Sequence, residues 1–110
     1  MATVTWVGSA SIDSATAGNW STGSVPGSGD NIVFGSGSNA NLCAWDSGAI
    51  GQVSKITIES GFTQTLRFLG GTVICQSLEV QKAGSIDATS STNLTFNDAA
   101  YDFTNAYVKI

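Results

Sequence analysis

The segment Ser54-Lys55-Ile56-Thr57-Ile58-Glu59 alternates polar and apolar side chains and is followed by the turn formers Ser60-Gly61. Alternation with a period of two is typical of a strand that buries one face. The two isoleucines belong to a series of apolar-x-apolar pairs: Ile32/Phe34, Ile56/Ile58, Leu78/Val80 and Leu94/Phe96. Successive pairs are 24, 22 and 16 residues apart, a spacing that fits the rungs of a parallel β-solenoid.

A second apolar row follows the first by about ten residues. Its members are Leu42, Leu66/Phe68, Ile86 and Phe103. In a β-helix both rows would stack inward, with Gly, Ser and Asn at the corners. Short strands with turn signals every 8–12 residues or so are equally typical of an antiparallel sandwich. The fold class is therefore all-β: a short parallel β-helix of about three to four rungs with an N-terminal cap, or an antiparallel β-sandwich or jelly roll.

The composition indicates one β domain. The chain has 110 residues, of which 42% are hydrophobic and only 11% charged, against roughly 25% charged in an average domain. Ser, Thr, Asn and Gly, which suit turns and strand faces, take the place of the charged residues. No segment shows a 3.6-residue period over ten positions, so very little helix is expected. We expect residues 1–34 to form the cap and first strands, and residues 35–110 the rungs.

The charge pattern excludes two classes of partner. The net charge is −4, and the four basic residues are scattered along the chain. Nucleic acids and anionic membranes both require clustered basic side chains. No apolar run approaches the roughly 20 residues of a membrane span, and residues 1–6 lack the pattern of a signal peptide. If Met1 is native, we expect no export through a signal of the chain's own.

Residues 5–34 carry a resemblance. They include Thr5-Trp6-Val7-Gly8, Gly18-Asn19-Trp20-Ser21 and the segment Val25-Pro26-Gly27-Ser28-Gly29-Asp30-Asn31-Ile32-Val33-Phe34. This TWxG, NWS and VPGxGDxxxF pattern resembles a segment at the start of β-solenoid regions in bacterial surface and autotransporter-like proteins and in phage virion proteins. The resemblance implies a solenoid cap or first rung and brings no catalytic residues with it.

The cap interpretation has a physical basis in three residues. Trp6 and Trp20 offer large apolar areas that could cover an open solenoid end, and Asp30 can bind turn backbone after Gly29. The two tryptophans could equally pack in an ordinary core. A further alternative is that they are exposed and bind sugars or a partner.

The leading functional hypothesis is a phage capsid decoration, or cement, protein, which a short chain starting at its own Met resembles. We expect a non-enzymatic homo-oligomer, with a trimer favoured, in the virion after assembly in the host cytoplasm. Its partner would be the major capsid protein or another shell protein, with no nucleic acid and no membrane. The aromatic residues outside the repeating rows are the interface candidates: Trp45, Phe62, Tyr101, Phe103 and Tyr107.

The alternative hypothesis is a β-helical binding module of a secreted bacterial adhesin or surface protein. Such a module would lie outside the cell or on its surface. It would contact glycans or host surfaces through Trp20, Trp45 or Tyr101.

Catalysis is not expected, and no cofactor is predicted. The chain has no histidine, which removes the commonest general base and transition-metal ligand. Glu59 and Glu79 occupy similar places about one rung apart, so a pair of glycosidase carboxylates is conceivable. A solvated outward row is the preferred interpretation of these two residues.

Three weaker signals remain. Asp98 and Asp102, with Asn97 and Asn105, could hold Ca²⁺ through oxygen ligands, although a solvated loop is preferred and no metal site is predicted. Cys43 and Cys75 could form a disulfide or remain buried thiols. The sequons at Asn19 and Asn93 matter only in a host that glycosylates.

Overall fold

Ten short strands and two 3₁₀ turns make up the regular structure that the computed structural model describes. It describes residues 3–27, 29–46, 50, 53–69, 71–82, 85–87, 94–97, 100–102 and 108–109, and of residues 71–74, 76, 94–97, 100–102 and 108–109 only the backbone. The elements are β1 (Thr3–Thr5), η1 (Ala17–Asn19), β2 (Asn31–Phe34), η2 (Ser36–Ser38), β3 (Cys43–Trp45), β4 (Val53–Ile58), β5 (Leu66–Phe68), β6 (Gly71–Val80), β7 (Ile86–Asp87), β8 (Leu94–Asn97), β9 (Ala100–Asp102) and β10 (Val108–Lys109). The described residues contain no α-helix.

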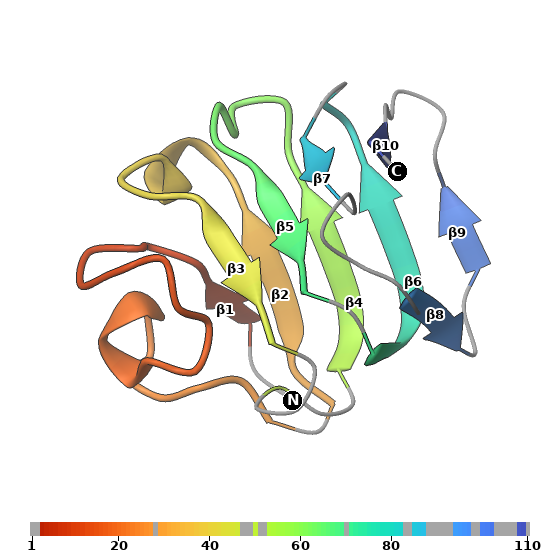
Figure 1. Ribbon diagram of the computed structural model, residues 1–110, viewed down its shortest axis with the longest axis horizontal. Helices are drawn as coiled ribbons and strands as arrows, with labels where there is room; N and C mark the ends of the chain where they lie inside the picture. Colours follow the sequence, from red (N-terminus) through yellow and green to blue (C-terminus); the bar gives the residue numbers. More distant parts are fainter. Residues whose placement is uncertain are drawn as a thin grey trace.

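The strands form two sheets, and every described strand-to-strand ladder is parallel. The larger sheet has the order β1-β2-β4-β6-β8, with β9 also paired to β6, and the smaller has the order β10-β7-β5-β3. From β2 to β7 the chain alternates between the two sheets, so that each strand pairs with the strand two places later (Figure 1). The alternative of an antiparallel sandwich is therefore wrong for the described ladders.

The first apolar row is confirmed over three strands. Ile32 lies opposite Ile56, which lies opposite Leu78, and the second members Phe34, Ile58 and Val80 keep the same register. The row extends one strand earlier than expected, because Val4 pairs with Ile32. All of these side chains are buried, as a period of two with one buried face requires.

The second row is confirmed at Leu66 and Ile86 but is wrong at its start. Cys43, not Leu42, lies opposite Leu66, and Trp45 lies opposite Phe68. A shift of one residue moves a side chain to the other face of a strand. Cys43 and Trp45 therefore point inward, whereas Leu42, just before β3, is only half-buried.

The expected fourth rung is also wrong in register. Leu94 and Phe96 pair with Gly71 and Val73, in the first half of β6, and the residue opposite Leu78 is Tyr101. Residues 71–80 form the single ten-residue strand β6. One long strand can pair with β8 along one half and with β9 along the other.

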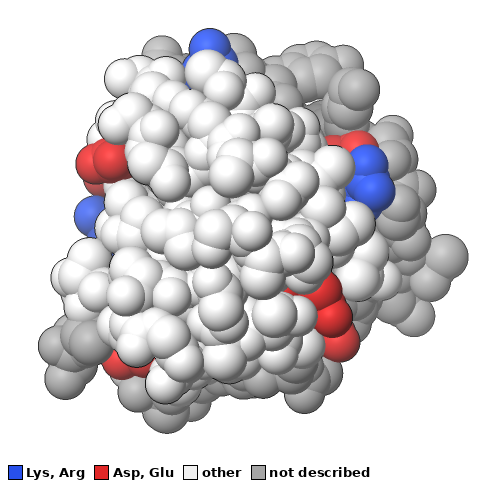
Figure 2. Space-filling view, turned by 90° about the vertical axis from the view of Figure 1, so that its left-hand side faces the viewer, with Lys and Arg blue, Asp and Glu red and all other residues white. Residues whose placement is uncertain are grey.

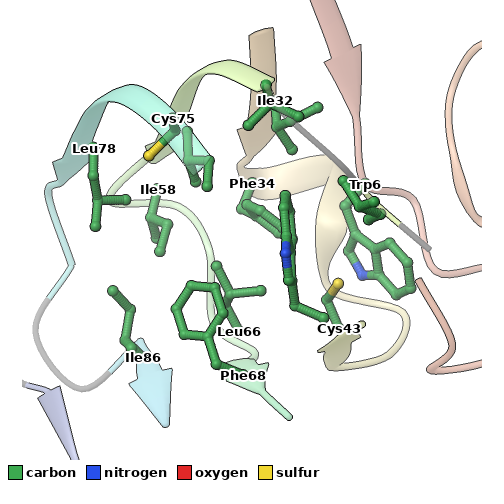
Figure 3. Packing of buried hydrophobic residues seen from close by; sticks show 14 of the residues in the cluster. Trp6, Ile32, Phe34, Cys43, Ile58, Leu66, Phe68, Cys75, Leu78 and Ile86 are labelled. Carbon is green, nitrogen blue, oxygen red and sulfur yellow. The ribbon is translucent and has the colours of Figure 1, made fainter. Parts of the chain in front are cut away.

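The core lies between the two sheets. Figure 3 shows Phe34, Ile58 and Leu78 from the larger sheet directed toward Leu66, Phe68 and Ile86 from the smaller one. These six side chains are at most 1% exposed, and full burial of one such side chain contributes about 1.5–3 kcal/mol. Because both sheets contribute inward rows, the stack shares one continuous apolar core.

Candidate functional site

The best-defined local arrangement is the loop between β1 and β2, which folds around the side chain of Asn19. Asn19 Oδ1 accepts hydrogen bonds from the backbone N–H groups of Ala10 and Ser11, both at 2.8 Å. Its Nδ2 donates to Ser11 Oγ at 2.9 Å and to the Asp13 carbonyl at 2.8 Å. Asn19 is 0% exposed, and with two bonds at each atom its amide is fully satisfied.

The same loop covers the outer edges of both sheets. Residues 12–14 run beside β3: the Ala44 N–H donates to the Ile12 carbonyl at 2.8 Å, and the Ser14 N–H donates to the Ala44 carbonyl at 3.2 Å. On the other side, the Ser21 N–H donates to the Thr5 carbonyl at 2.9 Å, and the Thr5 N–H donates to Ser21 Oγ at 2.9 Å. In Figure 1 the loop lies at the left, outside β1 and β3.

Trp6 and Trp20 lie in the core beneath this loop. Their ring centroids are 5.0 Å apart in an edge-to-face arrangement, and both contact Phe34 at 6.5 Å. The indole N–H of Trp6 donates to the Asn41 carbonyl and that of Trp20 to the Ser14 carbonyl. Both rings are buried, so neither is available for stacking on a sugar.

Residues 25–27, 29 and 30 of the VPGSGD segment lie in the turn that leads into β2. The Asp30 carboxylate accepts from the Gly27 N–H at 2.9 Å, as the sequence suggested for turn backbone, and the Asp30 N–H donates to the Gly27 carbonyl. Gly29 has φ of 82°, a left-handed conformation that favours glycine. Pro26 is buried, and Val25 packs against the core.

Two asparagines join the loops that follow neighbouring strands of the larger sheet, β1, β2 and β4. Asn39 Oδ1 accepts from the Thr63 N–H at 2.7 Å, and its Nδ2 donates to the Gly61 carbonyl at 3.0 Å. Asn41 Nδ2 donates in the same way to the Gly8 carbonyl at 2.6 Å. These contacts join the loop that follows β2 to the loops that follow β4 and β1.

Of the five interface candidates, the structure describes the side chains of two, Trp45 and Phe62, and both are buried. Trp45 is 1% and Phe62 0% exposed, and Phe62 packs on Phe34 with ring centroids 5.3 Å apart. Both aromatics fill the core, so their side chains are not accessible to a partner. Tyr101 lies in β9, where only the backbone is described, and Phe103 and Tyr107 lie outside the described residues.

The two carboxylates considered for catalysis have different surroundings. Glu79 pairs with Lys55 Nζ at 3.4 Å and accepts from the side-chain amide of Gln81. Glu59 follows β4 and lies beside Gly35, where an added Cβ would collide with Glu59 Oε1. The register partner of Glu79 is Thr57, not Glu59.

Both cysteines are free and buried. Burial raises the pKa of Cys43 well above its usual value, and the Asp13 carboxylate raises it further. Burial also raises the pKa of Cys75, although a backbone hydrogen bond with Ser77 acts in the opposite direction. The reactive form of a thiol is the thiolate, so these two thiols are poor nucleophiles in the folded chain.

The acidic segment considered for Ca²⁺ is divided among different elements. Asn97 ends β8 and Asp102 ends β9, while Asp98 and Asn105 lie outside the described residues, as does the sequon residue Asn93. Among the described residues, no three His, Cys, Asp or Glu side chains lie close enough together to hold a metal. The Asn19 sequon is unsuited to glycosylation because its amide is buried and fully hydrogen-bonded.

Charge is sparse on the surface that the loop between β1 and β2 forms. Figure 2 shows this side of the molecule, with uncharged residues in its middle and charged ones toward its rim. Residues 8–27 include a single charged residue, Asp13, and many exposed Ser, Thr, Ala and Gly residues. Among the described residues, the only exposed large apolar side chains are Ile12 and Leu69, at 44% and 49%.

Comparisons with protein-family models, curated proteins and solved structures give no match to this chain. In the described part of the chain, no helix has the length and hydropathy needed to cross a membrane.

Proposed function

We propose that the chain folds as a short parallel β-solenoid of about three to four rungs, closed at one end by a cap within residues 1–34. The alternation of strands between two parallel sheets supports this fold. The near-equal extents of 29 × 26 × 25 Å are compatible with it. Neighbouring strands are about 4.8 Å apart, so a stack of a few layers is no taller than it is wide.

We also propose that the chain is a non-enzymatic structural protein of a virion that decorates a phage shell. The observation that carries this proposal is the construction of residues 5–34, the segment that bears the resemblance. Side-chain hydrogen bonds of Asn19, Ser21 and Asp30 fix its turns. A surface that is already ordered binds by shape at a low entropic cost.

The mechanism of such a protein is stabilisation by mass action. A subunit that binds the assembled shell, and not its separated parts, shifts the equilibrium toward the shell. We propose that the chain acts as a homo-oligomer, with a trimer favoured, on the major capsid protein or another shell protein. The sparse charge at the capped end favours contacts through shape and hydrogen bonds.

Density-gradient separation of the native source, followed by intact-mass analysis of each fraction, tests this proposal. We expect a polypeptide near 11.3 kDa that migrates with large particles. If the sequence occurs within a much longer envelope or secreted polypeptide, the virion proposal is wrong. The chain would then be a module of a surface protein, and such a module would need contacts other than Trp20 and Trp45, which are buried.

A further inference from the structure

The loop that closes the capped end occupies hydrogen-bonding groups on the outer edges of both sheets. On β1 these groups are the N–H and carbonyl of Thr5, which bind Ser21. On β3 they are the N–H and carbonyl of Ala44, which bind Ser14 and Ile12. We propose that Asn19 holds this loop, the cap, over the edges of β1 and β3, and that each edge can pair with a strand of another chain once the cap is released. The partner that fits these edges is a second copy of this chain.

Asn19 holds the cap in place because its hydrogen bonds connect both halves of the cap. Its backbone carbonyl accepts from the Val7 and Gly8 N–H groups, next to the segment that covers β1. Its side chain binds Ala10, Ser11 and Asp13, in and beside the segment that covers β3. Without the amide, the turn around residues 10–13 loses these three bonds and the bond from Asn19 Nδ2 to Ser11 Oγ, at a site where Asn19 is 0% exposed.

Release of the cap would leave the edge groups of Thr5 and Ala44 unpaired. Unpaired strand edges are templates for pairing with another chain, because backbone N–H and carbonyl groups need partners when they are shielded from water. The acceptor strands β1 and β3 carry no charged residue, so like charges do not oppose pairing. Every copy carries the same two edges, which makes a second copy the partner always present at equal concentration.

This inference rests on the fold and not on the virion proposal. Analytical ultracentrifugation of the Asn19→Ala protein over a concentration series, beside the wild type, tests it. We expect the wild type to keep one assembly state and Asn19→Ala to form larger species whose share rises with concentration. Far-UV circular dichroism should show that the variant keeps its β structure.

A variant whose strand edges cannot pair distinguishes edge pairing from non-specific association. The N–H groups of Thr5 and Ala44 point away from β2 and β5, since they bind the cap. Adding Thr5→Pro and Ala44→Pro to Asn19→Ala therefore removes the edge donors, and proline is tolerated on edge strands. We expect this triple variant to return to the wild-type assembly state.

Two results would overturn the inference. One is a folded Asn19→Ala protein with the wild-type assembly state at every concentration. The other is equal association of the variants with and without the prolines. If Asn19→Ala does not fold, the milder Asn19→Asp, which retains the acceptors for Ala10 and Ser11, is judged by the same two criteria.

Discussion

The loop between β1 and β2, which we call the cap, and the paired strands β2 to β7 with the described loops between them, which we call the stack, are ordered by different interactions. Strands β2, β4 and β6 hold together through parallel ladders and a row of buried apolar side chains. The described residues between positions 8 and 30 contain no strand and depend on side chains that bind backbone, above all that of Asn19. The comparison teaches that the stack distributes its stability over many similar contacts, whereas the cap concentrates it in a few polar groups.

The largest expected effect comes from Phe34→Ala, at the junction of the two regions. Phe34 is fully buried and contacts Trp6 and Trp20 of the cap and Phe62 of the stack. Removing such a ring leaves a cavity, and we expect the free energy of unfolding to fall by about 3–5 kcal/mol. Denaturant titration measures it. The neighbouring outward-facing Val33→Ala is the control, with a loss below about 1 kcal/mol; equal losses would mean that Phe34 does not join the two regions.

The next largest effect on the unfolding free energy is expected when an asparagine of the cap is replaced, and an asparagine of the stack serves as the comparison. Asn19→Ala removes four hydrogen bonds in a buried site, and each unpaired buried group costs about 1–3 kcal/mol. Asn39→Ala removes corner contacts at a half-exposed site, where water can replace them. We expect Asn19→Ala to lower the unfolding free energy by at least about 2 kcal/mol and Asn39→Ala by less than half as much. The reverse order would contradict the concentration of cap stability in Asn19.

The sequence predicted the stack far better than the cap. Alternating pairs such as Ile56/Ile58 identify both a strand and its buried face, and the similar spacing of the first three pairs, 24 and 22 residues, then predicts which strands pair. The pairing predicted from the apolar pattern is wrong where register depends on one residue, as at Leu42 and Cys43. It is also wrong where one strand pairs with two others, as β6 does. Periodicity gives no information on which turn binds which side chain, so the NWS motif and the sequon mark Asn19 in the sequence without indicating its buried hydrogen bonds to the backbone.

The interface candidates show the same limit. Trp45 and Phe62 stand outside the repeating rows of the sequence, which made them candidates for an interface, yet both are buried. A large aromatic ring near a turn can still reach the core, because burial of its area is favourable wherever the backbone allows it. Only an inward register for Trp45, opposite Phe68, could have indicated this.

A third prediction compares a tryptophan of the cap with one of the stack. The indole N–H of Trp6 is bound to the Asn41 carbonyl at 3.0 Å, whereas that of buried Trp45 has no hydrogen-bond partner in the described structure. Both substitutions by Phe remove similar volume, but only Trp6→Phe leaves an acceptor unpaired. We therefore expect Trp6→Phe to cost about 1 kcal/mol more than Trp45→Phe in unfolding free energy. Equal values would indicate that Trp45 also has a partner.

An effect of similar size is expected within the turn that leads from the cap to β2. Gly29 has φ of 82°, and an added Cβ would meet no atom within 4 Å. The cost of Gly29→Ala is therefore one of backbone conformation alone, about 1–2 kcal/mol. Gly27 is equally open but lacks a positive φ, so Gly27→Ala should be neutral or slightly stabilising. Thermal unfolding of the two variants measures the difference, and a neutral Gly29→Ala would show that the turn relaxes freely.

The smallest effect is a pH dependence that couples the two regions. Burial, and after it the Asp13 carboxylate of the cap, raises the pKa of Cys43 in the stack. An unfolded thiol loses its proton near pH 8.5 or so, while the folded chain retains it. The unfolded state then binds fewer protons, so stability is full below this pH and falls as pH rises toward the folded pKa. We expect a shallower fall in melting temperature between pH 8 and 10 for Cys43→Ala than for the wild type. Asp13→Asn should show an intermediate slope, because it removes only the secondary cause; a slope equal to that of the wild type would mean that the cap carboxylate does not act on Cys43.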